Sequence, residues 1–138
     1  MSPLNVVFLS RPDPTREEIV KRLATPELKI SWVDPSLPEP EFIRQCKEAE
    51  AVAGFVSRIT PQVASQLPKL KFIQLFSAGF DSLDVKALGE MGIRIANNGG
   101  ANSVSVSEHT IALMLSVYRR MMDAWWNVKQ RKWREGIE

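Results

Sequence analysis

The chain has 138 residues, of which 44% are hydrophobic and 25% are charged, the proportions of a soluble globular protein. Its formal net charge of +2 is too small to indicate a polyanionic partner, so nucleic acid is not an expected ligand. The single cysteine, Cys46, excludes an intrachain disulfide and a multi-cysteine metal site, and it favours a reducing compartment such as the cytoplasm.

Neither end of the chain predicts an association with membranes. The first residues lead directly into the apolar run Val6–Leu9 without a basic segment, which argues against a signal peptide. The longest apolar stretch, Ile111–Leu115, is far too short to span a bilayer. The bases that accumulate from Arg119 onward lack a nucleic-acid-reading motif, so they are interpreted as a solvated helix face.

Short runs of β-type residues alternate with helical patterns along the first two thirds of the chain. Strands are predicted at residues 6–9, 29–33, 51–56, 71–76 and 93–96. Helices are predicted at residues 15–24, 39–49, from 61 onward, and 83–91. The helix starts are a capping box from Thr15 to Glu18 and the Thr60-Pro61 pair, and Gly92 is a C-terminal signal for the last helix.

Five strands that alternate with four helices predict an α/β fold, a parallel sheet with helices on both faces. In such sheets ligands bind at the carboxyl ends of the strands. We therefore expect a site near the loops that follow Leu9, Phe76 and Ala96.

The pattern changes after Ala96. A polar loop at 97–102 precedes one long helix, predicted from Ser103 to about Lys132, with Asn102 as N-cap and a further capping-box match at Ser105 and Glu108. Apolar residues cover most of the circumference of its first half, so we expect it to be buried on more than one side by a second domain or a partner chain.

Motifs for phosphate and metal binding are not found. The seven glycines never form a dinucleotide fingerprint or a P-loop, and no aspartate follows the third strand as a phosphoacceptor domain would require. His109 is the only histidine, lacks a second ligand at metal spacing, and is interpreted as a structural helix residue.

The loop Ser77–Asp81 follows the fourth predicted strand and has two interpretations. Its small residues let backbone amides approach a ligand closely, and such amides can hold a carboxylate. Taken alone, however, the loop is better interpreted as a strand-to-helix turn with Gly79 at positive φ, which is the more frequent role of such a segment.

Four blocks together resemble the D-isomer-specific 2-hydroxyacid dehydrogenases. They are Leu70–Asp84, Gly92–Asn97, Asn102–Leu115 and Tyr118–Arg120, and their order and spacing are similar to those of the family over essentially the whole chain. The resemblance implies a hydride transfer between NAD or NADP and a small 2-keto or 2-hydroxy acid, in a homodimer.

The resemblance also implies a division of the chain into domains. Residues 1–98 would form a flavodoxin-like substrate domain, and residues 99–138 would be interdomain and dimerisation helices at the start of a Rossmann domain that continues beyond Glu138. The cofactor fingerprint and the catalytic arginine, glutamate and histidine of the family would lie there too. The chain would then contain no catalytic residue, and as an isolated polypeptide it would be inactive.

Site residues follow from the same resemblance. The amides of Ala78 and Gly79 would hold the substrate carboxylate, and Phe80 would line the pocket near the nicotinamide. The substrate-binding set is Ser77, Ala78, Gly79, Phe80 and Asn102; the cofactor-binding set is Phe80, Ser103 and Val106. The alternative is a protein-interaction module, because Gly79–Asp81 and Tyr118–Arg120 are also similar to the C-terminal-binding-protein corepressors.

Overall fold

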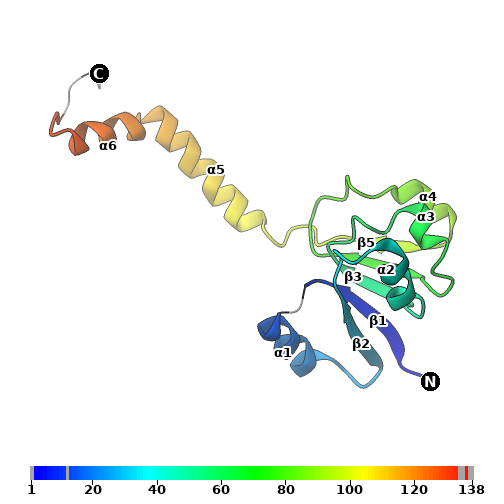
Figure 1. The fold of residues 1–138 in the computed structure, drawn as a ribbon. Helices are drawn as coiled ribbons and strands as arrows, with labels where there is room; N and C mark the ends of the chain where they lie inside the picture. The colour runs from blue at the N-terminus through cyan, green and yellow to red at the C-terminus, as the bar shows by residue number, and fades with distance from the viewer. Residues whose placement is uncertain (1, 12, 134–135, 137–138) are drawn as a thin grey trace. The chain divides into compact units, whose positions relative to one another are not determined.

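The computed structural model describes residues 2–11, 13–133 and 136, and the chain forms two compact units, Met1–Gly99 and Gly100–Glu138 (Figure 1). The first unit is built around a sheet and the second consists of helices.

The first unit contains one parallel sheet of five strands in the order β2-β1-β3-β4-β5. The strands are β1 (Leu4–Leu9), β2 (Leu28–Val33), β3 (Ala51–Gly54), β4 (Phe72–Leu75) and β5 (Arg94–Ala96). The strand order reverses beside β1, which is the flavodoxin-like arrangement. The predicted α/β fold with a parallel five-stranded sheet is confirmed.

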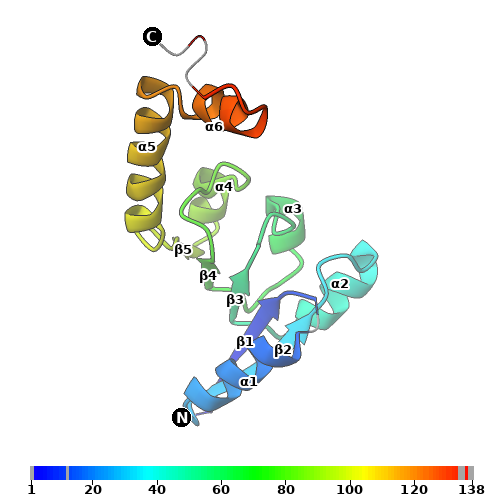
Figure 2. The ribbon, with the colours of Figure 1, turned by 90° about the vertical axis from the view of Figure 1, so that its left-hand side faces the viewer.

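Four helices connect the strands and lie on both faces of the sheet. They are α1 (Pro14–Leu23), α2 (Glu39–Cys46), α3 (Pro61–Ala64) and α4 (Val85–Glu90). Parallel crossovers are right-handed, and the chain moves one way from β1 to β2 and the other way from β2 to β5. Consequently α1 lies on one face and α2, α3 and α4 lie on the other (Figures 1 and 2).

The main core lies between the sheet and the face covered by α2, α3 and α4. Alternate strand residues point into it, and they are in register across the sheet: Val7 is opposite Val52, and Val52 is opposite Ile73. Phe42 of α2 and Leu88 of α4 are fully buried against them. The opposite face carries Phe8, Trp32 and Phe76 beside α1; the ring of Phe8 packs in a tilted arrangement against the other two, with centroids 4.9 Å and 5.9 Å apart.

Two helix starts show where local patterns succeed and fail. Thr60 is the N-cap of α3 and accepts a hydrogen bond from the amide of Val63, as predicted. The capping box from Thr15 is wrong, because Asp13 is the N-cap of α1 and its carboxylate accepts from the amides of Thr15 and Arg16. A carboxylate one residue before a proline at the first helical position outcompetes a hydroxyl inside the helix.

The second unit contains α5 (Ser103–Tyr118) and α6 (Met121–Lys129) rather than the single long helix predicted. The chain breaks at Arg120, which has a left-handed backbone with φ of 48°. The amides of Arg119 and Arg120 bond back to Leu115 and Val117, which closes α5 before α6 begins.

The N-terminus of α5 also differs from prediction. Asn102 occupies the N-cap position but its side chain makes no capping hydrogen bond. Ser105 lies inside the helix, so its capping-box assignment with Glu108 is wrong. Instead, the hydroxyl of Ser103 donates to the carbonyl of Gly100 at 2.8 Å. Within the described part of the chain, neither α5 nor any other helix is long and apolar enough to cross a bilayer.

Candidate functional site

The loop Ser77–Phe80 begins at the carboxyl end of β4, between the ends of β3 and β5. The ladder continues slightly past the strands on both sides: Phe76 donates from its amide to the carbonyl of Gly54, and Asn98 donates to the carbonyl of Ser77. The loop therefore lies at the edge of the sheet where parallel α/β proteins bind their ligands.

The carbonyl groups of this loop are tied down by neighbouring side chains. Asn97 Nδ2 donates to the carbonyl of Ala78 at 2.6 Å, and Asn98 Nδ2 donates to the carbonyl of Phe76 at 3.4 Å. The Ser77 hydroxyl donates to the carbonyl of Gly79 at 2.8 Å. With their acceptors engaged, the peptide groups of the loop have little freedom to rotate.

The amide groups of the same loop, unlike its carbonyl groups, have no hydrogen-bond partner among the described residues. Among the residues that the structure describes, no acceptor receives a hydrogen bond from the amide of Ala78, Gly79 or Phe80. Gly79 does not have a positive φ, so the alternative interpretation of this segment as a turn that needs a left-handed glycine is wrong. Consecutive amides held by fixed carbonyls and left without acceptors suit an anion such as a carboxylate.

The sequence pattern did not single out Asn97 and Asn98 as part of the site. Both follow β5, which pairs with β4, so in a parallel sheet they come beside the loop that follows β4. Two amide side chains directly after an edge strand were the available signal, because such side chains supply donors to neighbouring loop carbonyls.

A groove of about 500 Å³ adjoins the loop, with Phe80 and Asn97 among its lining residues. The rest of its lining is apolar and comes from α4, from β5 and from the residue before β5: Val85, Gly89, Ile93, Ile95 and Ala96. The ring of Phe80 is about half exposed, with 48% of its surface accessible. The loop thus has an apolar wall on one side and polar amides on the other.

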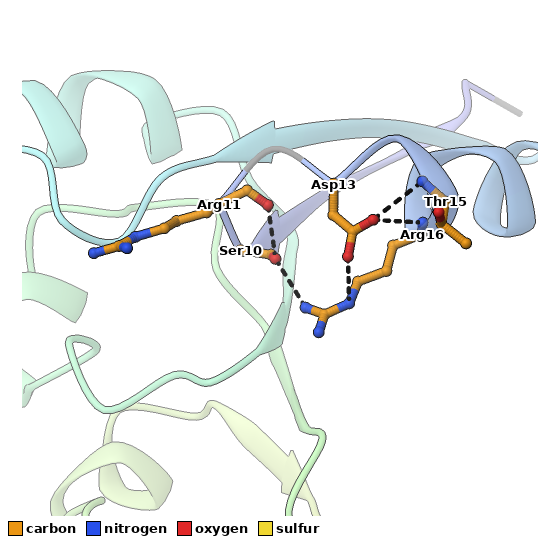
Figure 3. A network of polar contacts seen from close by, with 5 residues as sticks. All are labelled: Ser10, Arg11, Asp13, Thr15 and Arg16. Atoms are coloured by element: carbon orange, nitrogen blue, oxygen red, sulfur yellow. Dashed lines mark hydrogen bonds and ion pairs between the residues drawn. The ribbon is translucent and has the colours of Figure 1, made fainter.

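A polar network occupies the same edge of the sheet at the end of β1 (Figure 3). Asp13 accepts from the amides of Thr15 and Arg16 through Oδ1, and its Oδ2 lies 3.1 Å from Nε of Arg16. Nη1 of Arg16 donates to Ser10 Oγ at 3.2 Å, and Ser10 Oγ donates to the carbonyl of Arg11 at 2.9 Å. The side chain of Arg11 points away from this network (Figure 3).

Arg58 fixes the segment between β2 and α2. Its Nη1 donates to the carbonyls of Pro35 and Leu37, at 2.6 and 2.5 Å, and its guanidinium carbon lies 4.8 Å from the centre of the Phe42 ring. Beside it, burial raises the pKa of the Cys46 thiol to about 11, and the charge of Arg58 offsets part of that rise. This cysteine is a core residue in its neutral form.

The remaining predicted site residues, Asn102, Ser103 and Val106, belong to the second unit, at the start of α5. The structure thus brings Ser77–Phe80 together as one loop, and the other three residues belong to the other unit. Across the described ranges, no group of three His, Cys, Asp or Glu side chains is placed to hold a metal ion.

A family model for the catalytic domain of the D-isomer specific 2-hydroxyacid dehydrogenases matches residues 6–132. A D-3-phosphoglycerate dehydrogenase of Archaeoglobus fulgidus is 31% identical over 122 residues, which are 88% of this chain and 23% of that protein. A glyoxylate/hydroxypyruvate reductase B of Yersinia pestis is 27% identical over 139 aligned positions, covering 99% of this chain and 41% of the relative.

Solved structures agree with this match. A D-lactate dehydrogenase from Aquifex aeolicus, in complex with NAD and lactic acid, superposes with a TM-score of 0.68 at 30% identity; the match covers 93% of this chain and 38% of that one. The chain therefore spans less than half the length of these relatives.

Proposed function

This chain belongs to the D-isomer specific 2-hydroxyacid dehydrogenase family, and we propose that it is the substrate-binding part of an oxidoreductase acting on a small 2-hydroxy or 2-oxo acid. In this proposal the amides of Ala78 and Gly79 hold the substrate carboxylate. The observation that carries it is the loop after β4, whose carbonyls are engaged while its amides have no acceptor among the described residues.

The chemistry of the loop supports a carboxylate in particular. Amide donors bind an anion best when they are already oriented, because no free energy is then used to order them. Asn97 and Ser77 supply that orientation by holding the carbonyls of Ala78 and Gly79. Phe80 and the apolar groove beside it would cover the uncharged part of the acid.

Substitution of Gly79 by valine tests this proposal. A Cβ at Gly79 meets only Asp81 Oδ2, at 3.5 Å, which is ordinary contact, and its φ is not in the left-handed region. The fold should therefore accept the side chain, whereas an incoming carboxylate should be blocked. We expect affinity for glycolate to fall about tenfold to a hundredfold, the value of one charge-assisted hydrogen bond.

The measurement is isothermal titration of glycolate into the 138-residue chain and its Gly79→Val variant. Gln66→Val is the control, since Gln66 is exposed just after α3 and belongs neither to the loop nor to the lining of the groove beside it. An unchanged affinity in a variant that melts at the same temperature as the parent would remove the loop from the site.

For the cofactor, we propose that this chain supplies only part of the binding site. When bound, NAD or NADP would accept or supply the hydride, and Phe80, Ser103 and Val106 are the residues of this chain proposed to contact it. The chain has no G-x-G-x-x-G sequence to cradle the pyrophosphate, so these residues do not fit a complete dinucleotide site. We accordingly expect the 138-residue chain alone to oxidise no NADH in the presence of a 2-oxo acid.

The homodimer is also a proposal, and α5 supports it. Its apolar side chains are exposed in this unit, including Ile111, Leu113 and Val117. The hydroxyls of Ser107 and Thr110 donate to carbonyls one turn back in the same helix, so these two side chains do not need water as an acceptor. Such a surface is typical of a helix covered by protein.

A further inference from the structure

Arg16 holds its guanidinium at the carboxyl edge of β1, and a buried side chain orients it (Figure 3). Ser10, the acceptor of the bond from Nη1, is only 8% exposed, and it is the one polar residue among the buried residues described. Because the Ser10 hydroxyl donates to the carbonyl of Arg11, its oxygen lone pairs remain to accept from Arg16. The guanidinium is thus held by more than a surface ion pair.

The stability of α1 does not account for this arginine. Arg16 lies in the first turn, where the helix dipole disfavours a positive charge. Asp13 offsets that effect, and it already satisfies the amides of Thr15 and Arg16, so the helix end itself has no donors left there for a ligand. The guanidinium has five N–H donors; within the described part of the chain Nη1 donates to Ser10, and Nε forms an ion pair with Asp13. Its side chain is 54% exposed, so the other donors can meet a ligand.

The position of Arg16 relates it to the loop after β4. Arg16 lines an apolar crevice of about 130 Å³ together with Phe8, Trp32 and Phe76, and Phe76 directly precedes Ser77. Strands β1 and β4 flank β3, so their carboxyl ends are separated by two strand spacings, roughly 10 Å. A four-carbon acid held by the loop amides extends over about half of that distance, and the arginine side chain can cover the remainder.

We propose that Arg16 is a specificity-determining residue that binds a second anionic group on the substrate, a carboxylate or a phosphate at the end remote from the first carboxylate. The substrate class is therefore a dianionic 2-hydroxy or 2-oxo acid. This inference rests on the proposed role of the amides of Ala78 and Gly79. Asp13 and Ser10 act as positioning residues, because they set the direction of the guanidinium without touching the ligand.

The test compares one monoanion with two dianions on the 15N-labelled 138-residue chain by NMR titration. Glycolate, D-malate and D-3-phosphoglycerate should all shift the amide signals of Ala78 and Gly79. The two dianions should also shift the Nε–H signal of Arg16 and should bind about tenfold more tightly than glycolate, about 1.4 kcal/mol. The stronger of the two dianions identifies the preferred group as carboxylate or phosphate, and either result supports the proposal.

Two variants separate specificity from structure. Arg16→Gln should abolish the advantage of the dianions and leave glycolate binding unchanged. Arg22→Gln removes the same charge from the last turn of α1 and should keep the full advantage. Ser10→Ala, which keeps the arginine and removes its buried partner, should lose part of the advantage.

The outcomes distinguish failure of this inference from failure of the proposed function. Equal affinities for glycolate and the dianions, with normal shifts at the loop, would overturn the role of Arg16 and leave the loop as the carboxylate site. Shifts at Arg16 without shifts at the loop would mean adventitious anion binding only, which also overturns it. If no ligand shifts the loop amides, the proposed function itself is contradicted.

Discussion

The two units of this protein differ in how fully each buries its own apolar side chains. In the sheet unit, apolar residues from every strand and from α2, α3 and α4 enclose one another, and Phe42 and Ile73 are fully buried. In the helical unit, among the residues described, the helices close their own hydrogen bonds while Val117 and Tyr118 stay about 80% exposed. Backbone hydrogen bonding can therefore be complete within a segment whose apolar burial depends on other surfaces.

The largest expected effect lies in the core of the sheet unit. Phe42→Ala removes a fully buried ring from between α2 and the sheet and from beneath the guanidinium of Arg58, so the free energy of unfolding should fall by about 3–5 kcal/mol. Phe55→Ala is the control, because Phe55 is largely exposed and should cost less than about 1 kcal/mol. Urea unfolding followed by circular dichroism measures both, and similar losses would contradict the assignment of the core.

Substitution of two glycines by alanine should give the next largest changes in stability, a loss at one position and a gain at the other. Gly54 has a φ of 132°, and an added Cβ would lie 2.5 Å from the carbonyl oxygen of Leu9, so Gly54→Ala should cost about 2–3 kcal/mol. Gly89→Ala places a methyl group in open space on α4 and should raise stability by about 0.5–1 kcal/mol. Thermal melts measure both variants. If their melting temperatures shifted in the same direction relative to the parent chain, the packing of β1 against β3 at Gly54 would be refuted.

The helical unit should respond in association rather than in folding. If α5 mediates dimerisation, Val117→Asp places a charge in the covered surface and should weaken the dimer by about 1.5–3 kcal/mol, tenfold or more in dissociation constant. The melting temperature of the sheet unit should be unchanged. Sedimentation at several micromolar concentrations measures the shift; a parent chain that is monomeric throughout would remove α5 as a dimer surface.

The smallest effect is a loss of stability at high pH. Burial raises the pKa of the Cys46 thiol from its ordinary value of 9.0 to about 11, so the folded state favours the neutral thiol. This contribution is complete below pH 9 and is lost as the pH rises towards 11. At about pH 10 the parent should have lost about 1 kcal/mol more than Cys46→Ala, and parallel pH profiles of the two proteins would contradict this burial.

The sheet could be predicted from the sequence because its signals are local. Val6–Leu9, Thr60-Pro61 and Gly92 each carry a strand, cap or helix-end pattern that the fold retains. The helix break at Arg120 had no such signal, since arginine is a good helix former and the left-handed turn contains no glycine there. Local patterns also misplaced the first N-cap at Thr15, where the carboxylate of Asp13 competes successfully.

The candidate site was predictable in part for the same reason. Ser77–Phe80 was singled out by its small residues after a strand and by family resemblance. Asn97 and Asn98 reach the loop only because β4 pairs with β5. Likewise, the orientation of Arg16 depends on its hydrogen bond to Ser10 across the turn after β1. Such contacts between separate segments become visible only when the fold is known.

A crystal structure of the 138-residue chain with D-lactate bound would test the central claim most directly. The account predicts one carboxylate oxygen at hydrogen-bond distance, about 2.9 Å, from the amide nitrogens of Ala78 and Gly79, with the carbonyls of both residues still held by Asn97 and Ser77. A D-lactate carboxylate bound elsewhere, with these two amides facing only water, would contradict it.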